Sequence, residues 1–165
     1  MYKKGEYIVY GSSGPCLVTD ITRLDMPGCD RKRKYYVLRP VISNRSTIYC
    51  PVDNQKVKTR DVMGPSEAKE MLSDIADMPS MKIDNEKKRE DQYREVLRNT
   101  NFRDWISMLK MLVLRRQIRA DEGRKFTSVD ERYLREVGDI ATCELSIALG
   151  EDRNKVHDKL VDLIG

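Results

Sequence analysis

Residues 7–21 have the sequence YIVYGSSGPCLVTDI, in which two short runs of β-branched and aromatic residues flank a glycine–serine turn. Such runs are typical of β-strands joined by a tight turn. Similar runs recur at 34–40 and 47–52, and a fifth strand is expected around 56–59. Short strands at this close spacing predict a small, strongly bent antiparallel sheet or barrel, because closure or near-closure covers the sheet edges.

The spacing of apolar residues becomes helical after Gly64-Pro65-Ser66. Ser66 is expected to cap the first helix, and Ser128-Val129-Asp130-Glu131 has the spacing of a capping box. The predicted fold class is therefore α+β, with a small N-terminal antiparallel β-barrel in residues 1–63 and a C-terminal helical bundle of about five helices in residues 64–165. The helices are expected over 66–78, 85–99, 102–113, 128–149 and 156–164.

The composition, 39% hydrophobic and 35% charged residues with a net charge of +4, is that of a soluble globular chain. Lysine and arginine outnumber acidic residues in 1–60 and 87–119, and the reverse holds in 61–86 and 120–165. Two basic surfaces suited to polyanions or acidic protein patches are one interpretation, and chance clustering is the other. No apolar run of 18 residues and no signal-peptide pattern occur, which predicts a cytoplasmic protein with no membrane partner.

No motif of an active site is present: the chain lacks GxxxxGK[ST], GxGxxG, GxSxG and HExxH. His157 is the only histidine, and it lies in a charged stretch without further metal ligands. The four cysteines, at 16, 29, 50 and 143, form no CxxC pair and are interpreted as small core residues. We therefore expect no catalytic activity, no cofactor and no metal.

Basic side chains are concentrated on two consecutive predicted helices, where they suit phosphate contacts and counterion release. The alternative is that they form solvated helix faces stabilised by ion pairs. Trp105 has the same two interpretations, because it could stack on bases but shares an apolar stripe with Ile106 and Leu109. The candidate DNA-binding residues are Lys87, Lys88, Arg89, Arg94, Arg115, Arg116 and Arg119.

The β region contains more tyrosines than a small barrel can bury, so some must point outward. Exposed tyrosines beside Arg31-Lys32-Arg33-Lys34 would form a surface for binding protein or nucleic acid. The alternative is that the rings line the rim of the barrel with their hydroxyls in water. These tyrosines are Tyr7, Tyr10, Tyr35, Tyr36 and Tyr49.

Several short stretches together resemble the CarD/CdnL family of bacterial transcription regulators, whose N-terminal module is similar to the polymerase-interaction domain of transcription-repair coupling factors. The resemblance begins with residues 2–14, YKKGEYIVYGSSG, and continues through Tyr35-Tyr36-Val37-Leu38, Ile48-Tyr49-Cys50-Pro51-Val52 and Arg60-Asp61-Val62-Met63. In the helical part it includes Gln92-Tyr93-Arg94, Arg115-Arg116-Gln117, residues 126–131 and residues 144–149.

The resemblance implies a Tudor-like β-barrel that docks on the β subunit lobe of RNA polymerase, and a helical domain that touches promoter DNA at the upstream edge of the transcription bubble. It also implies regulation of open-complex stability without catalysis, by a protein that is monomeric when free. Polymerase-contact positions of the family fall on Leu24 and Tyr49, and Tyr35 is added as a candidate contact from the tyrosine pattern.

The chain departs from the family at the position of a tryptophan that wedges into DNA, because Arg89 stands there. Whether Arg89 or Trp105 replaces that wedge stays open from the sequence, and contact with DNA is expected more through phosphates and the minor groove than through intercalation. Two functions of other kinds stay open from the sequence: a module that binds only protein, and an RNA-binding β-barrel without promoter contact.

Overall fold

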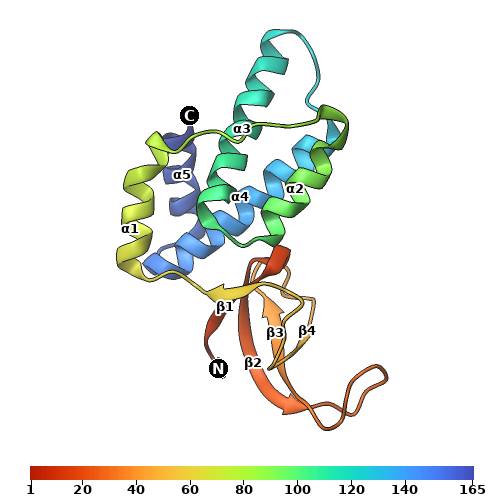
Figure 1. Ribbon diagram of the computed structural model, residues 1–165. Coiled ribbons are helices and arrows are strands. Elements are labelled where there is room, and N and C mark those ends of the chain that lie inside the picture. The colour runs from red at the N-terminus through yellow and green to blue at the C-terminus, as the bar shows by residue number, and fades with distance from the viewer.

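The computed structural model describes residues 1–165 as a five-stranded antiparallel sheet followed by five α-helices (Figure 1). The α+β fold class is thus confirmed. The strands, which together form the β module, are β1 (Tyr7–Tyr10), β2 (Pro15–Arg23), β3 (Lys34–Pro40), β4 (Ile48–Pro51) and β5 (Thr59–Asp61). The helical domain comprises α1 (Pro65–Asp74), α2 (Arg89–Arg98), α3 (Phe102–Asp121), α4 (Ser128–Leu149) and α5 (Arg153–Ile164). Single 3-10 turns are η1 (Gly11–Ser13), η2 (Ile75–Asp77) and η3 (Glu86–Lys88).

The sheet has the strand order β4-β3-β2-β1-β5, and every neighbouring pair is antiparallel. A register shift between Val18 and Asp20 interrupts the long β2–β3 ladder. Strands β4 and β5 are the two edges and do not pair with each other, so the sheet is open and not a hydrogen-bonded barrel. The fifth strand begins at Thr59, later than predicted, because the side chain of Asn54 holds Lys56 and Val57 in a turn.

The β module has its own small core, formed by Ile8, Cys16, Val18, Tyr36, Leu38 and Cys50. Tyr35 and Tyr36 are both buried, so the expectation that some tyrosines of each strand point outward is wrong for β3. The hydroxyl of Tyr36 accepts a hydrogen bond from the backbone N–H of Tyr2 at 3.1 Å, and that of Tyr35 accepts one from Asp30 at 3.0 Å. Because each hydroxyl has a partner, each ring can be buried without leaving a polar group unsatisfied.

The helices begin at other caps than those predicted. Gly64 is the N-cap of α1, and Pro65 occupies the first helical position, where its missing N–H costs nothing. Thr127, and not Ser128, caps α4: its hydroxyl accepts from the N–H of Asp130 at 3.2 Å. Helix α4 ends at a left-handed Gly150, as the sequence predicts.

The β module and the helical domain are joined by an ion pair between the half-buried Arg60 of β5 and the buried Glu144 of α4. Glu144 is 0% exposed, and its two oxygens accept from the Arg60 guanidinium at 2.5 and 2.7 Å. The N–H of Met63 donates to the same carboxylate at 3.2 Å, and Arg60 Nε donates to the carbonyl of Thr100 at 2.6 Å. The guanidinium carbon also lies 5.4 Å from the ring centroid of Trp105. Strand β5 is therefore attached to α4, to α3 and to the turn between α2 and α3.

Apolar contacts reinforce this junction. Val9 of β1 belongs to the helical core and not to the core of the β module. Gly14 has a positive φ of 69°, and a Cβ there would lie 2.7 Å from the Cγ2 of Ile140 on α4. The sheet and α4 are thus in close contact at a position that only glycine can occupy without displacing its neighbour.

Replacing Arg60 by alanine should destabilise the whole chain. The change leaves the buried Glu144 carboxylate without its cation, which typically costs about 3–5 kcal/mol. Urea unfolding followed by circular dichroism measures this loss. Arg98→Ala, at an arginine that makes only a long, exposed ion pair, is the control and should change stability by less than about 0.5 kcal/mol. Equal stability of the two variants would contradict this account of the junction.

Candidate functional site

Strand β4 is a free edge of the sheet, because it pairs only with β3. Tyr49 lies in this strand opposite Val37 and is 39% exposed, and Leu24 is half-buried just beyond the end of β2. An open edge offers unpaired backbone N–H and C=O groups to which an extended segment of another protein can add. Two predicted contact residues are therefore accessible. The third, Tyr35, is buried and supports the β2–β3 loop, so it does not present an exposed ring to a partner.

The seven candidate DNA-binding cations separate into two groups. Arg89, Arg94 and Arg115 form ion pairs with carboxylates of the same chain. The other four form no ion pair: Lys87, Lys88, Arg116 and Arg119. Of these, Arg119 is half-buried and donates to the carbonyl of Lys125 at 3.3 Å, whereas the remaining three are exposed.

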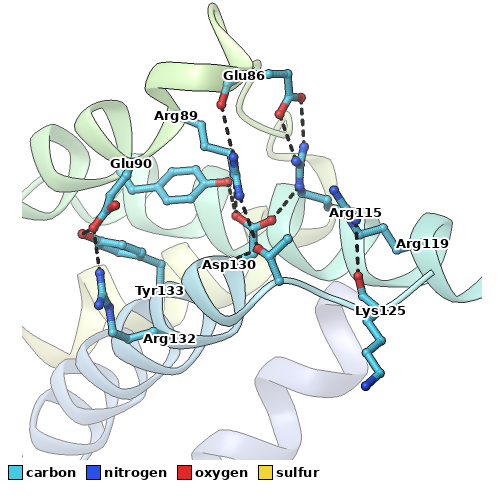
Figure 2. Close-up of polar contacts among 11 residues, drawn as sticks. Glu86, Arg89, Glu90, Arg115, Arg119, Lys125, Asp130, Arg132 and Tyr133 are labelled. Carbon is cyan, nitrogen blue, oxygen red and sulfur yellow. Dashed lines mark hydrogen bonds and ion pairs between the residues drawn. The ribbon is translucent and has the colours of Figure 1, made fainter.

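Asp130, in the first turn of α4, binds two of the arginines (Figure 2). Arg89 Nε donates to its Oδ1 at 3.0 Å, and Arg115 Nε donates to its Oδ2 at 2.8 Å. The hydroxyl of Tyr93 donates to Oδ1 at 2.8 Å. Side chains from α2, α3 and α4 therefore meet at one carboxylate that is 0% exposed.

The charge of Asp130 is stabilised by its donors. Burial alone would raise the pKa of this carboxyl, but hydrogen bonds from Tyr93, Arg89, Thr127 and Arg115 outweigh it and lower the pKa below the usual value. The neighbouring Tyr93 has a raised pKa, because burial and its bond to the carboxylate both favour the neutral phenol. Asp130 is thus an anion at neutral pH, and two arginine side chains donate to this one buried carboxylate.

Glu86 continues the network toward the surface. Its two oxygens accept from the two terminal nitrogens of Arg115, each at 2.9 Å, and this bond lowers the pKa of Glu86. Glu86 begins η3, whose other two residues are the exposed Lys87 and Lys88, and the Asn85 side chain caps this turn through the N–H of Lys87. The paired arginines therefore position a turn that presents two free lysines.

Neither candidate for the DNA wedge is available as one. Trp105 is 0% exposed, and its ring packs edge-on against Phe102 in the helical core. The Arg89 side chain is directed at Asp130 and Thr127, with its guanidinium 3.0 Å and 3.3 Å from their oxygens. Both residues hold the helical domain together, so in this structure no aromatic or guanidinium plane projects from either position.

Three of the four cysteines are core residues, as predicted: Cys16, Cys50 and Cys143 are buried, and Cys29 is half-buried. Burial raises the pKa of Cys16 to about 12 and that of Cys143 to about 11, so both remain protonated thiols. No helix of the structure has the length and apolar character needed to cross a membrane.

Sequence reasoning missed the two buried carboxylates. Glu144 lies between Cys143 and Leu145 in the last two turns of the longest helix, where a charged residue on the buried face is the one available signal. Asp130 carries no such signal, because an acid in the first turn of a helix is ordinary. Their partners lie 84 and 41 residues away in the sequence, at Arg60 and Arg89.

Comparison with protein families agrees with the geometry of the N-terminal part. Residues 2–63 match the model of the CarD-like/TRCF RID domain, which covers all five strands. A search of curated proteins returned no match for the chain. The β module is therefore a CarD-like domain of the kind that interacts with RNA polymerase, and the chain has a transcription-related role in protein interaction.

Asp130→Asn should destabilise the helical domain, since the amide leaves Arg89 without a counter-charge and removes one of the two carboxylates that bind Arg115. We expect a loss of about 2–4 kcal/mol at pH 7, measured by urea unfolding. Asp139→Asn, an exposed position of the same helix, is the control and should have little effect.

The same pair of variants tests the pH dependence. The pKa of Asp130 is lower in the folded than in the unfolded chain, where aspartate has a pKa of about 3.9. Its stabilisation is therefore complete above about pH 5 and declines as the pH falls through the folded value. Asp130→Asn should lose stability less steeply than wild type on acidification; parallel curves would show that the carboxylate is not stabilised as described.

Proposed function

We propose that the chain is a non-catalytic transcription regulator that joins RNA polymerase to promoter DNA. The β module binds the β subunit lobe of the polymerase, and the helical domain contacts DNA at the upstream edge of the transcription bubble. The observation that carries the proposal is a CarD-like domain fixed by the Arg60–Glu144 pair to a helical domain with free surface cations. Through the polymerase, the proposal locates the chain in the cytoplasm and, through promoter DNA, at the nucleoid.

The docking surface of the proposal is the free edge of the sheet. Strand β4 supplies backbone groups for an added strand, and Tyr49 supplies an exposed aromatic anchor of the kind enriched at interface centres. The opposite edge, β5, cannot serve in the same way, because its Arg60 is bound to Glu144 and β5 itself contacts the helical domain. A partner strand is therefore directed to the β4 side of the module.

The DNA contacts of the proposal are electrostatic. Lys87, Lys88 and Arg116 are exposed and unpaired, so they can bind phosphates and release counterions. None of them belongs to a helix that projects a set of base-reading side chains, and the acidic blocks of the chain oppose binding to DNA elsewhere. Specific placement then comes from the polymerase, which holds the cations at one site on the promoter.

Regulation follows from differential binding. A protein that contacts the polymerase and the DNA together binds the open complex with a different affinity from the closed one, and it shifts the population by that difference. A rigid connection between its two contacts makes the difference larger, because few orientations satisfy both.

A module that binds only protein is the second candidate. It is favoured by one observation: three of the seven predicted DNA-binding cations are neutralised within the chain. The two candidates differ in whether the free lysines affect promoter complexes.

Tyr49→Ala should weaken binding of the full chain to the isolated polymerase β lobe. Truncation of an exposed aromatic anchor costs about 1–2 kcal/mol, or about 5- to 30-fold in Kd, measured by calorimetry or fluorescence anisotropy. Tyr7→Ala is the matched control, because Tyr7 is equally exposed, at 41%, but lies on β1. If both variants bind like wild type, Tyr49 is not part of the docking surface.

The combined Lys87→Ala and Lys88→Ala variant tests the promoter contact. The change that the protein causes in open-complex lifetime should shrink, and the slope of log affinity for duplex DNA against log salt should fall by about 2. Lys69→Ala, at an exposed lysine of α1, is the control. A wild-type lifetime effect from the double variant, with polymerase binding intact, would favour the module that binds only protein.

A further inference from the structure

The C-terminal half of α3 projects beyond the neighbouring helices (Figure 1). Leu114 and Ile118 lie on this part, four residues apart and therefore on one face of the helix. They are 52% and 46% exposed, among the most exposed large apolar residues of the chain. An exposed apolar pair on a projecting helix is a common mark of an interaction surface.

A groove of about 630 Å³ runs along this face. Leu114, Ile118 and the nearly buried Met111 form its apolar floor along α3, and Ile83 of the preceding segment also lines it. We call this feature the α3 groove. The groove adjoins the η3 turn through Glu86, but neither Lys87 nor Lys88 lines it and no residue of the β4 edge does, so its lining differs from the surfaces of the proposed function.

The rim of the α3 groove is positively charged. It carries Lys82, Arg115, Arg119 and Arg124 against only Glu86 and Glu122. The two acids are already paired with arginines of the rim: Glu86 binds Arg115 at 2.9 Å, and Glu122 binds Arg124 at 3.5 Å. Lys82 and Arg119 have no acidic partner, so the groove retains positive charge beside its apolar residues.

Charge distinguishes this groove from the other apolar groove of the helical domain. The second one lies between α3, α4 and α5 and contains Arg116 and Arg135 against Glu131 and Asp139. Its charges balance, and it therefore selects no class of partner. The α3 groove selects a class of partner, because an occupant must offer apolar side chains to the floor and carboxylates to the rim.

We propose that the α3 groove binds an acidic amphipathic helix of a partner protein. Such a helix places apolar side chains at positions i, i+3, i+4 and i+7 on one face, which matches the stripe of Met111, Leu114 and Ile118. Glutamates beside that stripe would meet Lys82 and Arg119. Duplex DNA matches less well, because the floor offers no donors to phosphates and two glutamates line the walls.

The test uses the full chain and a synthetic helical peptide of about 18 residues, or five turns, with leucines in one stripe and glutamates beside them. One control peptide has the same composition with the leucines scattered, and another has lysine in place of glutamate. Fluorescence anisotropy should show at least about tenfold weaker binding of both control peptides. Equal binding of the scattered peptide, or tighter binding of the lysine peptide, would overturn the proposal.

Variants of the chain locate the site. Leu114→Ser and Ile118→Ser should each weaken binding of the acidic peptide at least about fivefold, and Arg119→Ala should reduce its dependence on salt. Val161→Ser is the matched control, because Val161 is 52% exposed on α5, away from the groove. Thermal unfolding of each variant checks that it is folded.

Duplex DNA provides the last comparison. If Leu114→Ser and Ile118→Ser weaken binding of a short duplex as much as that of the acidic peptide, the groove belongs to a nucleic-acid surface and the proposal fails. Loss of peptide binding with unchanged polymerase and DNA binding supports it independently of the proposed function.

Discussion

The bond between Arg60 and the buried Glu144 carboxylate is the contact on which the arrangement of this molecule depends. A carboxylate that is 0% exposed is costly unless its oxygens are filled, and here the Arg60 guanidinium and the Met63 N–H fill them. The requirement fixes a three-residue edge strand against the longest helix. Without it, β5 would have its ladder to β1, its short link to α1 and the contacts of Arg60 with Thr100 and Trp105.

The same physical device occurs a second time on α4. Asp130 and Glu144 are 14 residues apart, which is about four turns and about 21 Å along the helix, so they lie on nearly the same face. Glu144 binds the arginine of the β module, and Asp130 binds the arginines of α2 and α3. Apolar packing alone tolerates small rotations between helices, whereas a buried acid with directed donors does not. Helix α4 therefore sets the orientation of both the sheet and the η3 turn.

Hydrophobic spacing was sufficient to predict the fold class, the number of helices and the approximate place where strands give way to helices. Elements come from local patterns, and the apolar stripe around Trp105 indicated its burial as one of two interpretations. The use of charged residues was not predictable in this way. Nothing in the sequence around Arg89 and Arg115 distinguishes them from Arg116. Yet Arg89 and Arg115 are bound to Asp130 and Arg116 is free, because pairing depends on a partner that only the tertiary fold brings close. Tyr35 was misjudged for the same reason, since its hydroxyl partner lies in a loop.

The two buried acids also connect the proposed contacts with polymerase and DNA. Strand β4 is part of the sheet, and the sheet is fixed to α4 through Arg60. The η3 turn is fixed to the other end of α4 through Arg89 and Arg115. Lys87 and Lys88 are thereby held at a set distance and direction from the β4 edge. A wedge can act from a flexible arm, because insertion itself determines its position, but phosphates repeat along the whole duplex and lysine contacts to them do not select one place. A regulator that relies on lysines must have its geometry supplied by the scaffold, and the buried carboxylates of α4 are what this chain offers for that purpose.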